Sequence, residues 1–171
     1  SGFDKSKETL FSWLGVTYYL SAEAIDKTIG EIASLCSEGS ALVFDCPDEG
    51  FFSVPEKRVQ NTIMMAKAGG EPMRSAFSYA ELENLLGRHG FRIYDWLTPC
   101  NIQSRIIESV GSNLKAFEHV NYYLAVKKNE SYNTICQTQR RRAELVKTKL
   151  SCVFCFEKGY FYEPFEISFP E

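Results

Sequence analysis

Two arginines stand out as residues that could bind an acidic small molecule. Arg58 and Arg74 each carry a guanidinium group, which can hold a carboxylate through two parallel hydrogen bonds. The alternative for Arg58 is a solvated residue on the outside of a helix. The alternative for Arg74 is a structural ion pair with Glu71 or Glu81. Both arginines are kept as candidate substrate-binding residues.

The two histidines and one cysteine pair suggest other chemistry. His119 could be a base that takes a proton from a hydroxyl substrate, or a hydrogen-bonded histidine at the edge of a strand. His89 falls in the last turn of an expected helix, where a partly cationic imidazole complements the helix dipole. Cys152 and Cys155 form a single C-x-x-C without further ligand-like spacing, so we expect no metal site. All six cysteines are expected to be reduced: Cys36, Cys46, Cys100, Cys136, Cys152 and Cys155.

Two positions lie directly after short apolar runs that read as strands. One run ends at Gly15, and a second run, residues 41–44, ends at Asp45. Ligands of open α/β sheets bind at the carboxyl ends of the parallel strands. Gly15 would let the backbone approach a ligand while Tyr18 or Tyr19 lines the pocket; alternatively, Gly15 only makes the turn and both tyrosines pack in the core. Asp45 could orient a substrate or cap the turn that follows it.

The elements that would position these residues follow from apolar spacing and capping signals. Ser21 offers a cap for an amphipathic helix that ends before Gly39, so strand, helix and strand form one parallel βαβ unit. Ser78 and Glu81 form a capping box, and Gly90 has the place of a left-handed cap residue. The remaining expected elements are a helix over residues 55–68, strands over 9–14, 91–97 and 119–126, and a short helix from Pro99.

Two segments carry a resemblance to a known family. The first is LFSWLGVTYYL, in which Tyr19 and Leu20 follow four residues after Gly15, and the second is GEPMRSAFSYAELENLLGRHGF, residues 70–91. With the element order, they make residues 2–128 similar to the C-terminal half of a class I S-adenosylmethionine-dependent methyltransferase of the leucine carboxyl methyltransferase-like family. The resemblance implies the second half of a Rossmann-like α/β sheet, with three parallel strands, one antiparallel strand and flanking helices. It covers an expected domain at residues 1–128; residues 129–171 are a tail without a counterpart.

The resemblance implies an O-methyltransferase that transfers a methyl group from S-adenosylmethionine to a carboxylate or a hydroxyl. Many family members have a glutamate where this chain has Leu14, and their Gly-rich cofactor loop would lie upstream of residue 1, so this chain is expected to lack the main cofactor-binding half. The implied cofactor-binding residues are Leu14, Gly15, Val16 and Tyr19, and the implied substrate-binding residues are Asp45, Arg58 and Arg74.

A second hypothesis is a catalytically silent fragment or an oligomerising α/β module. A sheet without its first three strands would expose the edge of the fourth, and an unpaired edge is a template for association. We therefore expect a homo-oligomer or pairing with the missing N-terminal half. A nucleotide-binding module is less well supported, because no Gly-rich phosphate loop occurs.

Composition excludes several classes of protein. The 171 residues suit one domain, and a net charge of -3 with a pI of about 5.5 argues against nucleic-acid binding. The basic run Arg140 to Arg142 reads as a solvated helix face. No apolar run reaches the roughly 18 residues of a membrane span, and no signal peptide is recognisable, so we expect a soluble cytoplasmic protein without a membrane partner.

Overall fold

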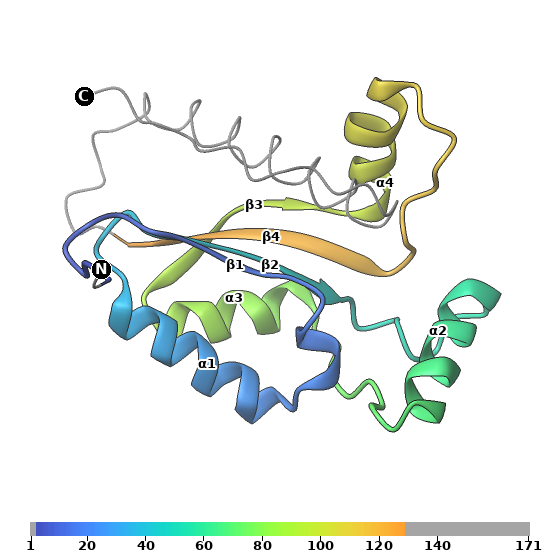
Figure 1. Cartoon of the computed structure of the whole chain (residues 1–171), viewed down its shortest axis with the longest axis horizontal. Helices are drawn as coiled ribbons and strands as arrows, with labels where there is room; N and C mark the ends of the chain where they lie inside the picture. Colours follow the sequence, from blue (N-terminus) through green and yellow to red (C-terminus); the bar gives the residue numbers. More distant parts are fainter. Residues whose placement is uncertain (1–2, 129–171) are drawn as a thin grey trace. The chain divides into compact units, whose positions relative to one another are not determined.

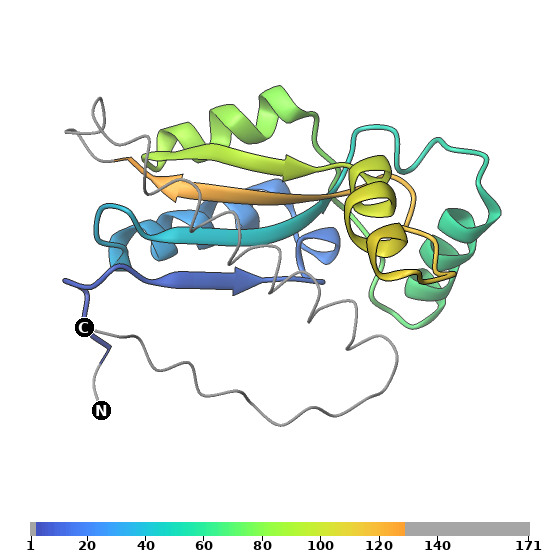
Figure 2. The same ribbon diagram turned by 90° about the horizontal axis from the view of Figure 1, so that it is seen from above.

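Four strands form a single sheet in the computed structural model, which describes residues 3–128. The strands are β1 (Leu10–Trp13), β2 (Ala41–Pro47), β3 (Phe91–Leu97) and β4 (Val120–Lys127), in the spatial order β1-β2-β4-β3 (Figures 1 and 2). β1 pairs with β2 in parallel, whereas β4 is antiparallel to both β2 and β3. Three strands therefore run in one direction and β4 runs between two of them in the other, which confirms the predicted α/β fold class.

Two helices cover one face of this sheet (Figure 1). Helix α1 (Ala22–Leu35) connects β1 to β2, and Ser21 caps it by accepting a hydrogen bond from the Ala24 N–H at 3.3 Å. Helix α3 (Tyr79–Arg88) starts with the predicted capping box of Ser78 and Glu81. The predicted parallel βαβ unit and both helix starts are confirmed.

The core lies between these helices and the sheet. Alternate residues of a strand point to the same face, so Leu42 and Phe44 of β2 and Tyr123 of β4 all face α1 and α3. The rings of Phe44 and Tyr123 stack with centroids 5.3 Å apart. The helices contribute the fully buried residues Ile25, Ile29, Leu82 and Leu86.

The carboxyl ends of β1 and β2 lead into the irregular part of the described chain. After β1 comes the short 3-10 helix η1 (Thr17–Tyr19), and after β2 comes a loop followed by helix α2 (Lys57–Ala68). A second, smaller core of Phe51, Val59 and Val120 holds this region together. The helix expected over residues 55–68 begins at Lys57, two residues later than predicted, because the backbone of the N-cap residue Glu56 is extended.

The connection from β3 to β4 is a chain of short helical turns. Helix α4 (Pro99–Ile102) continues as the π-helical turn η2 (Gln103–Ile107) and the 3-10 turn η3 (Glu108–Val110). Thr98 caps α4 and Pro99 occupies its first turn, which confirms the expected helix start. β4 begins at Val120 rather than at His119, which lies just outside the strand. No helix among residues 3–128 is both long and apolar enough to cross a membrane.

Candidate functional site

The turn after β1 is organised around Gly15. Its φ of 72° lies in the left-handed region, where a residue with a side chain would be strained. A Cβ atom at Gly15 would meet nothing within 4 Å, so the backbone conformation, and not crowding by the protein, requires glycine here. The Gly15 N–H donates a hydrogen bond to Asp45 Oδ1 at 2.8 Å. The two positions singled out in the sequence, Gly15 and Asp45, are therefore in direct contact. Asp45 lies within β2 and not after it as predicted, because β2 continues to Pro47 by pairing with β4.

Asp45 lies in β2 beside this turn and is buried, with 4% of its surface exposed. Its second oxygen, Oδ2, accepts a hydrogen bond of 2.5 Å from the Tyr18 hydroxyl. The Thr17 hydroxyl donates to the Asp45 backbone carbonyl at 2.6 Å. Burial raises the pKa of Asp45, although the hydrogen bonds from Tyr18 and Gly15 favour its charged form. Burial and the neighbouring Asp45 carboxylate raise the pKa of Tyr18, so its hydroxyl remains a hydrogen-bond donor.

The segment of residues 70–91 lies against this turn. The backbone N–H groups of Arg74 and Ser75 both donate to the Tyr18 carbonyl, at 2.6 and 3.3 Å. Ser75 is buried, and its hydroxyl donates to the Leu20 carbonyl. The Phe77 N–H donates to the Pro47 carbonyl at 3.0 Å, which ties the same segment to the end of β2. Two segments about fifty residues apart in the sequence thus build one site.

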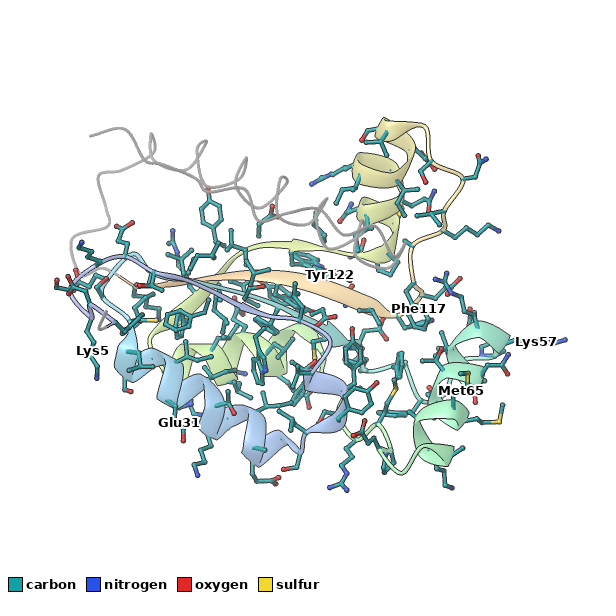
Figure 3. All side chains as sticks on the ribbon, viewed as in Figure 1. Lys5, Glu31, Lys57, Met65, Phe117 and Tyr122 are labelled. Atoms are coloured by element: carbon teal, nitrogen blue, oxygen red, sulfur yellow. The ribbon has the colours of Figure 1, made fainter. Side chains whose placement is uncertain are left out.

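The two candidate arginines have different surroundings. The Arg58 guanidinium donates to the carbonyls of Lys115 and Ala116, both at 3.2 Å, and lies 4.7 Å above the ring of Phe117. Figure 3 shows Phe117 beside the start of β4, facing α2. The Arg74 side chain is exposed and forms no ion pair with any described residue, including Glu71. Arg74 is therefore close to Gly15 and Asp45 through its backbone, whereas Arg58 binds the segment before β4.

The exposed surface of the turn is apolar. Val16 and Tyr19 are each 37% exposed, and Leu14 is half-buried. Together with the open space above Gly15, these side chains form a surface on which a ligand could lie. The structure brings the four candidate cofactor-binding residues together because they are consecutive or one helical turn apart.

Sequence reasoning missed the full role of Tyr18 and did not connect Asp48 with His119. The His119 Nδ1 atom lies 3.0 Å from both carboxylate oxygens of Asp48, a residue 71 positions away in the sequence. His119 Nε2 lies 3.9 Å from Glu56 Oε2. Asp48 could have been suspected from its place after a buried strand, but nothing local pairs it with His119.

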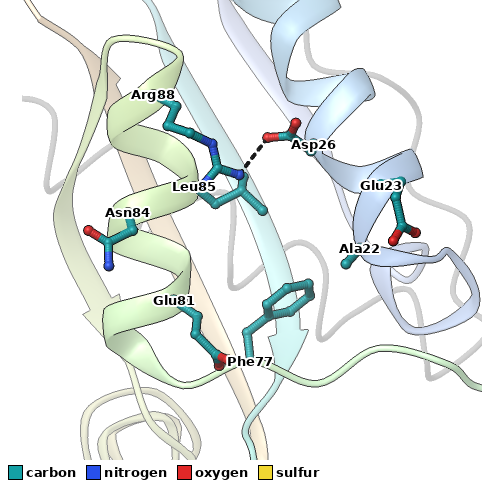
Figure 4. A pocket seen from close by; sticks show the side chains of 8 residues that line it. All are labelled: Ala22, Glu23, Asp26, Phe77, Glu81, Asn84, Leu85 and Arg88. Atoms are coloured by element: carbon teal, nitrogen blue, oxygen red, sulfur yellow. Dashed lines mark hydrogen bonds and ion pairs between the residues drawn. The ribbon is translucent and has the colours of Figure 1, made fainter.

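A separate hollow of about 460 Å³ lies between α1 and α3 (Figure 4). Three of its charged residues already have partners: Asp26 accepts hydrogen bonds from Arg88 and from His89, both at 2.9 Å, and Glu81 belongs to the capping box. These contacts connect the two helices. We therefore assign the hollow a structural role and place the candidate site at the carboxyl ends of β1 and β2.

No group of three possible metal ligands occurs within residues 3–128, and the cysteines there, Cys36, Cys46 and Cys100, are free. The C-x-x-C pair at Cys152 and Cys155 and the basic run at residues 140–142 lie outside the described residues, as does the expected tail at 129–171. The domain boundary expected at residue 128 stays a prediction.

Comparison with known proteins finds similar methyltransferase sequences. A family model described as leucine carboxyl methyltransferase matches residues 1–33. The chain is 41% identical over 126 residues to YktD of Bacillus subtilis (strain 168), a protein provisionally named as an S-adenosyl-L-methionine-dependent methyltransferase. The match covers 72% of this chain and 41% of YktD. A similarly named protein of Mycobacterium marinum is 36% identical over 104 residues, 54% of this chain and 33% of its own length. The chain thus spans less than half the length of these relatives.

A solved structure of a DUF574 family protein from Streptomyces avermitilis shares the fold. The TM-score is 0.55 at 12% sequence identity, and the match covers 73% of this chain and 46% of the other. At this identity the likeness concerns the fold alone.

Proposed function

We propose that this chain, which is similar to the leucine carboxyl methyltransferase-like family of S-adenosylmethionine-dependent methyltransferases, forms the C-terminal part of an O-methyltransferase. The methyl acceptor in this proposal is a carboxylate or a hydroxyl of a small molecule or peptide end. The observation that carries the proposal is the buried Asp45 carboxylate, which accepts hydrogen bonds from Gly15 and Tyr18 and so holds the turn after β1 at the carboxyl edge of the sheet. This edge is where open α/β sheets bind their ligands.

The turn after β1 is the part of this chain that we propose contacts the cofactor. In our proposal Leu14, Gly15, Val16 and Tyr19 contact S-adenosylmethionine, which supplies a methyl group already activated by a sulfonium. Gly15 leaves room for close approach, and Val16 and Tyr19 offer exposed apolar surface. The chain's own contribution is to align the reacting groups and exclude water from them. Asp45 acts through position, because both of its oxygens already accept hydrogen bonds.

Arg74 is the better placed of the two arginines for a substrate carboxylate. Its guanidinium is exposed, and its backbone is hydrogen-bonded to Tyr18 inside the proposed site. A fork of N–H donors at this position would hold an acidic group through two hydrogen bonds. Arg58 would first have to leave the carbonyls of Lys115 and Ala116, so we propose only a secondary role for it.

The open edge of β1 supports pairing with a second segment. The Ala41 N–H donates to the Thr9 carbonyl at 2.9 Å, so Thr9 and the alternate residue Phe11 direct their backbone groups toward β2. Leu10 and Ser12 consequently direct theirs away from the sheet, where no described strand lies. We propose that a strand of the cofactor-binding half pairs here. A second copy of this chain is the alternative partner.

Calorimetry with S-adenosylmethionine tests the proposed function. We expect binding when this chain is joined to, or mixed with, the cofactor-binding half, and weak or no binding by the chain alone. Replacing Tyr19→Ala should weaken binding about tenfold, which corresponds to the loss of about 1.4 kcal/mol of contact. Tyr79→Ala is the matched control, because Tyr79 is also 37% exposed but belongs to α3. If the complete form binds no S-adenosylmethionine, the silent module becomes the better reading.

A further inference from the structure

The pairing of His119 with Asp48 leads beyond the proposed function. We propose that His119 is a general base that takes the proton from a hydroxyl acceptor, and that Asp48 is the residue that positions it. This inference rests on the proposed methyl transfer and selects a hydroxyl over a carboxylate as the methyl acceptor. A carboxylate can attack a methyl group without a base, whereas a hydroxyl group benefits from proton removal as it reacts.

The imidazole of His119 is held in one orientation. A carboxylate can only accept, so the 3.0 Å contacts with both oxygens of Asp48 require a hydrogen on His119 Nδ1. Asp48 is itself fixed, because its Oδ1 accepts from the Gly50 N–H at 2.9 Å and its N–H donates to the His119 carbonyl at 2.9 Å. In the neutral imidazole, a hydrogen on Nδ1 leaves Nε2 as the basic nitrogen.

His119 Nε2 points toward Glu56 without a hydrogen bond to it. The Oε2 atom of Glu56 lies 3.9 Å from Nε2, which is too far for a hydrogen bond. The His119 side chain is 29% exposed, and Glu56, which directly precedes α2, has 42% of its side chain exposed.

The backbone of His119 is also unusual. Its φ of 61° is left-handed, and within residues 3–128 no other residue except glycine has a positive φ. Such a conformation costs free energy in a residue with a side chain, and strained residues of this kind cluster at functional sites. A glycine or an asparagine would fill this position with less strain. A histidine here suggests that its ring is needed.

His119 lies at the same edge of the sheet as the Gly15 turn. In the antiparallel pairing of β2 with β4, Pro47 is opposite Val120. The next pair of residues, Asp48 and His119, therefore also lie opposite each other. Phe51 connects the two places: it packs with Val120 in the smaller core, and its ring centroid is 6.5 Å from that of Tyr18. Packing around Phe51 thus connects the proposed base to the proposed cofactor-binding turn.

The reaction balances with these groups. The acceptor's O–H bond breaks and its proton moves to His119 Nε2. The acceptor oxygen forms a bond to the methyl carbon while the carbon–sulfur bond breaks and leaves its electron pair on sulfur. The proton on His119 then passes to solvent, which returns the imidazole to its neutral form.

A spectroscopic titration with 4-nitrophenol, an acceptor-like probe whose anion absorbs visible light, tests proton transfer without any methyl donor. We expect the wild-type chain to lower the apparent pKa of the probe by roughly one unit, because His119 accepts its proton. His119→Asn should abolish this shift while keeping a donor to Asp48 and a residue that tolerates the left-handed backbone. Asp48→Asn should reduce the shift. His89→Asn is the matched control and should leave it unchanged, since these are the two histidines of the chain.

The outcomes separate this inference from the proposed function. An equal shift in the wild type and in His119→Asn, or no shift in the wild type, overturns the role of His119 and leaves cofactor binding unaffected. Should His119→Asn fold poorly by circular dichroism, His119→Gly, which suits the positive φ, replaces it, and added imidazole should restore the shift. Failure of imidazole to restore the shift also overturns the proposal. Cofactor binding is measured separately by calorimetry, and its absence contradicts the proposed function.

Discussion

At the scale of single residues, Asp45 decides whether the turn after β1 keeps its shape. Asp45→Asn replaces one carboxylate oxygen by an amide nitrogen, which cannot accept from Gly15 or Tyr18. One donor is then left unsatisfied in a buried place, so we expect a loss of about 1–3 kcal/mol in the free energy of unfolding. Urea unfolding of the wild type and of Asp45→Asn at pH 7 measures this loss. An unchanged free energy would contradict the central place given to Asp45.

The same variant should also change how stability depends on pH. Burial raises the pKa of Asp45 above its unfolded value, so the folded chain binds this proton more tightly than the unfolded chain does. The contribution of Asp45 to the free energy of unfolding is therefore fully present below about pH 4, and it is lost as the pH rises through the raised pKa. We expect the stability advantage of the wild type over Asp45→Asn to shrink from pH 4 to pH 7. A growing advantage would mean that the pKa is lowered instead.

At the scale of elements, α1 and α3 fit together because Gly30 leaves room for His89. A Cβ on Gly30 would lie 3.0 Å from His89 Cε1, and His89 is held by Asp26 at 2.9 Å. Gly30→Ala should therefore not bring the gain of about 1 kcal/mol that alanine usually gives inside a helix. In a His89→Ala background the gain should return. Thermal unfolding of the single and double variants measures this coupling.

Gly87→Ala is the matched control for this helix pair. Gly87 lies in α3, and a Cβ there would meet nothing within 4 Å. We expect this variant to be more stable than the wild type by up to about 1 kcal/mol. If Gly30→Ala stabilises the wild type as much as Gly87→Ala does, His89 does not limit the approach of the two helices.

At the scale of the whole molecule, the free edge of β1 determines what the chain can assemble with. Ser12 is exposed and its N–H points away from β2, so Ser12→Pro should remove one edge hydrogen bond without disturbing the four-strand sheet. We expect Ser12→Pro to weaken association with the cofactor-binding half about tenfold or more. Ser12→Ala keeps the N–H and should associate normally. Light scattering after size-exclusion chromatography measures both variants, and equal association would rule out pairing at this edge.

Local signals in the sequence were sufficient to predict the elements. The Ser78 capping box, the strand 91–97 and the left-handed Gly90 are all confirmed, because caps and glycines act on the residues next to them. The parallel βαβ unit was predictable for a similar reason: a short crossover helix between two apolar strands allows few arrangements. The antiparallel direction of the last strand followed only from the family resemblance, and the place of β4 between β2 and β3 is known from the structure alone.

The contacts of the site depended on tertiary structure. The sequence marked Gly15 and Asp45 separately, but only the pairing of β1 with β2 brings the Gly15 N–H to the Asp45 carboxylate, 30 residues away. It also marked His119 as a possible base without a partner, and the antiparallel register of β4 on β2 places it opposite Asp48. Sequence patterns report periodicity over a few residues, whereas a site joins groups from several strand ends. Its geometry is therefore determined by strand order and register, which no local pattern encodes.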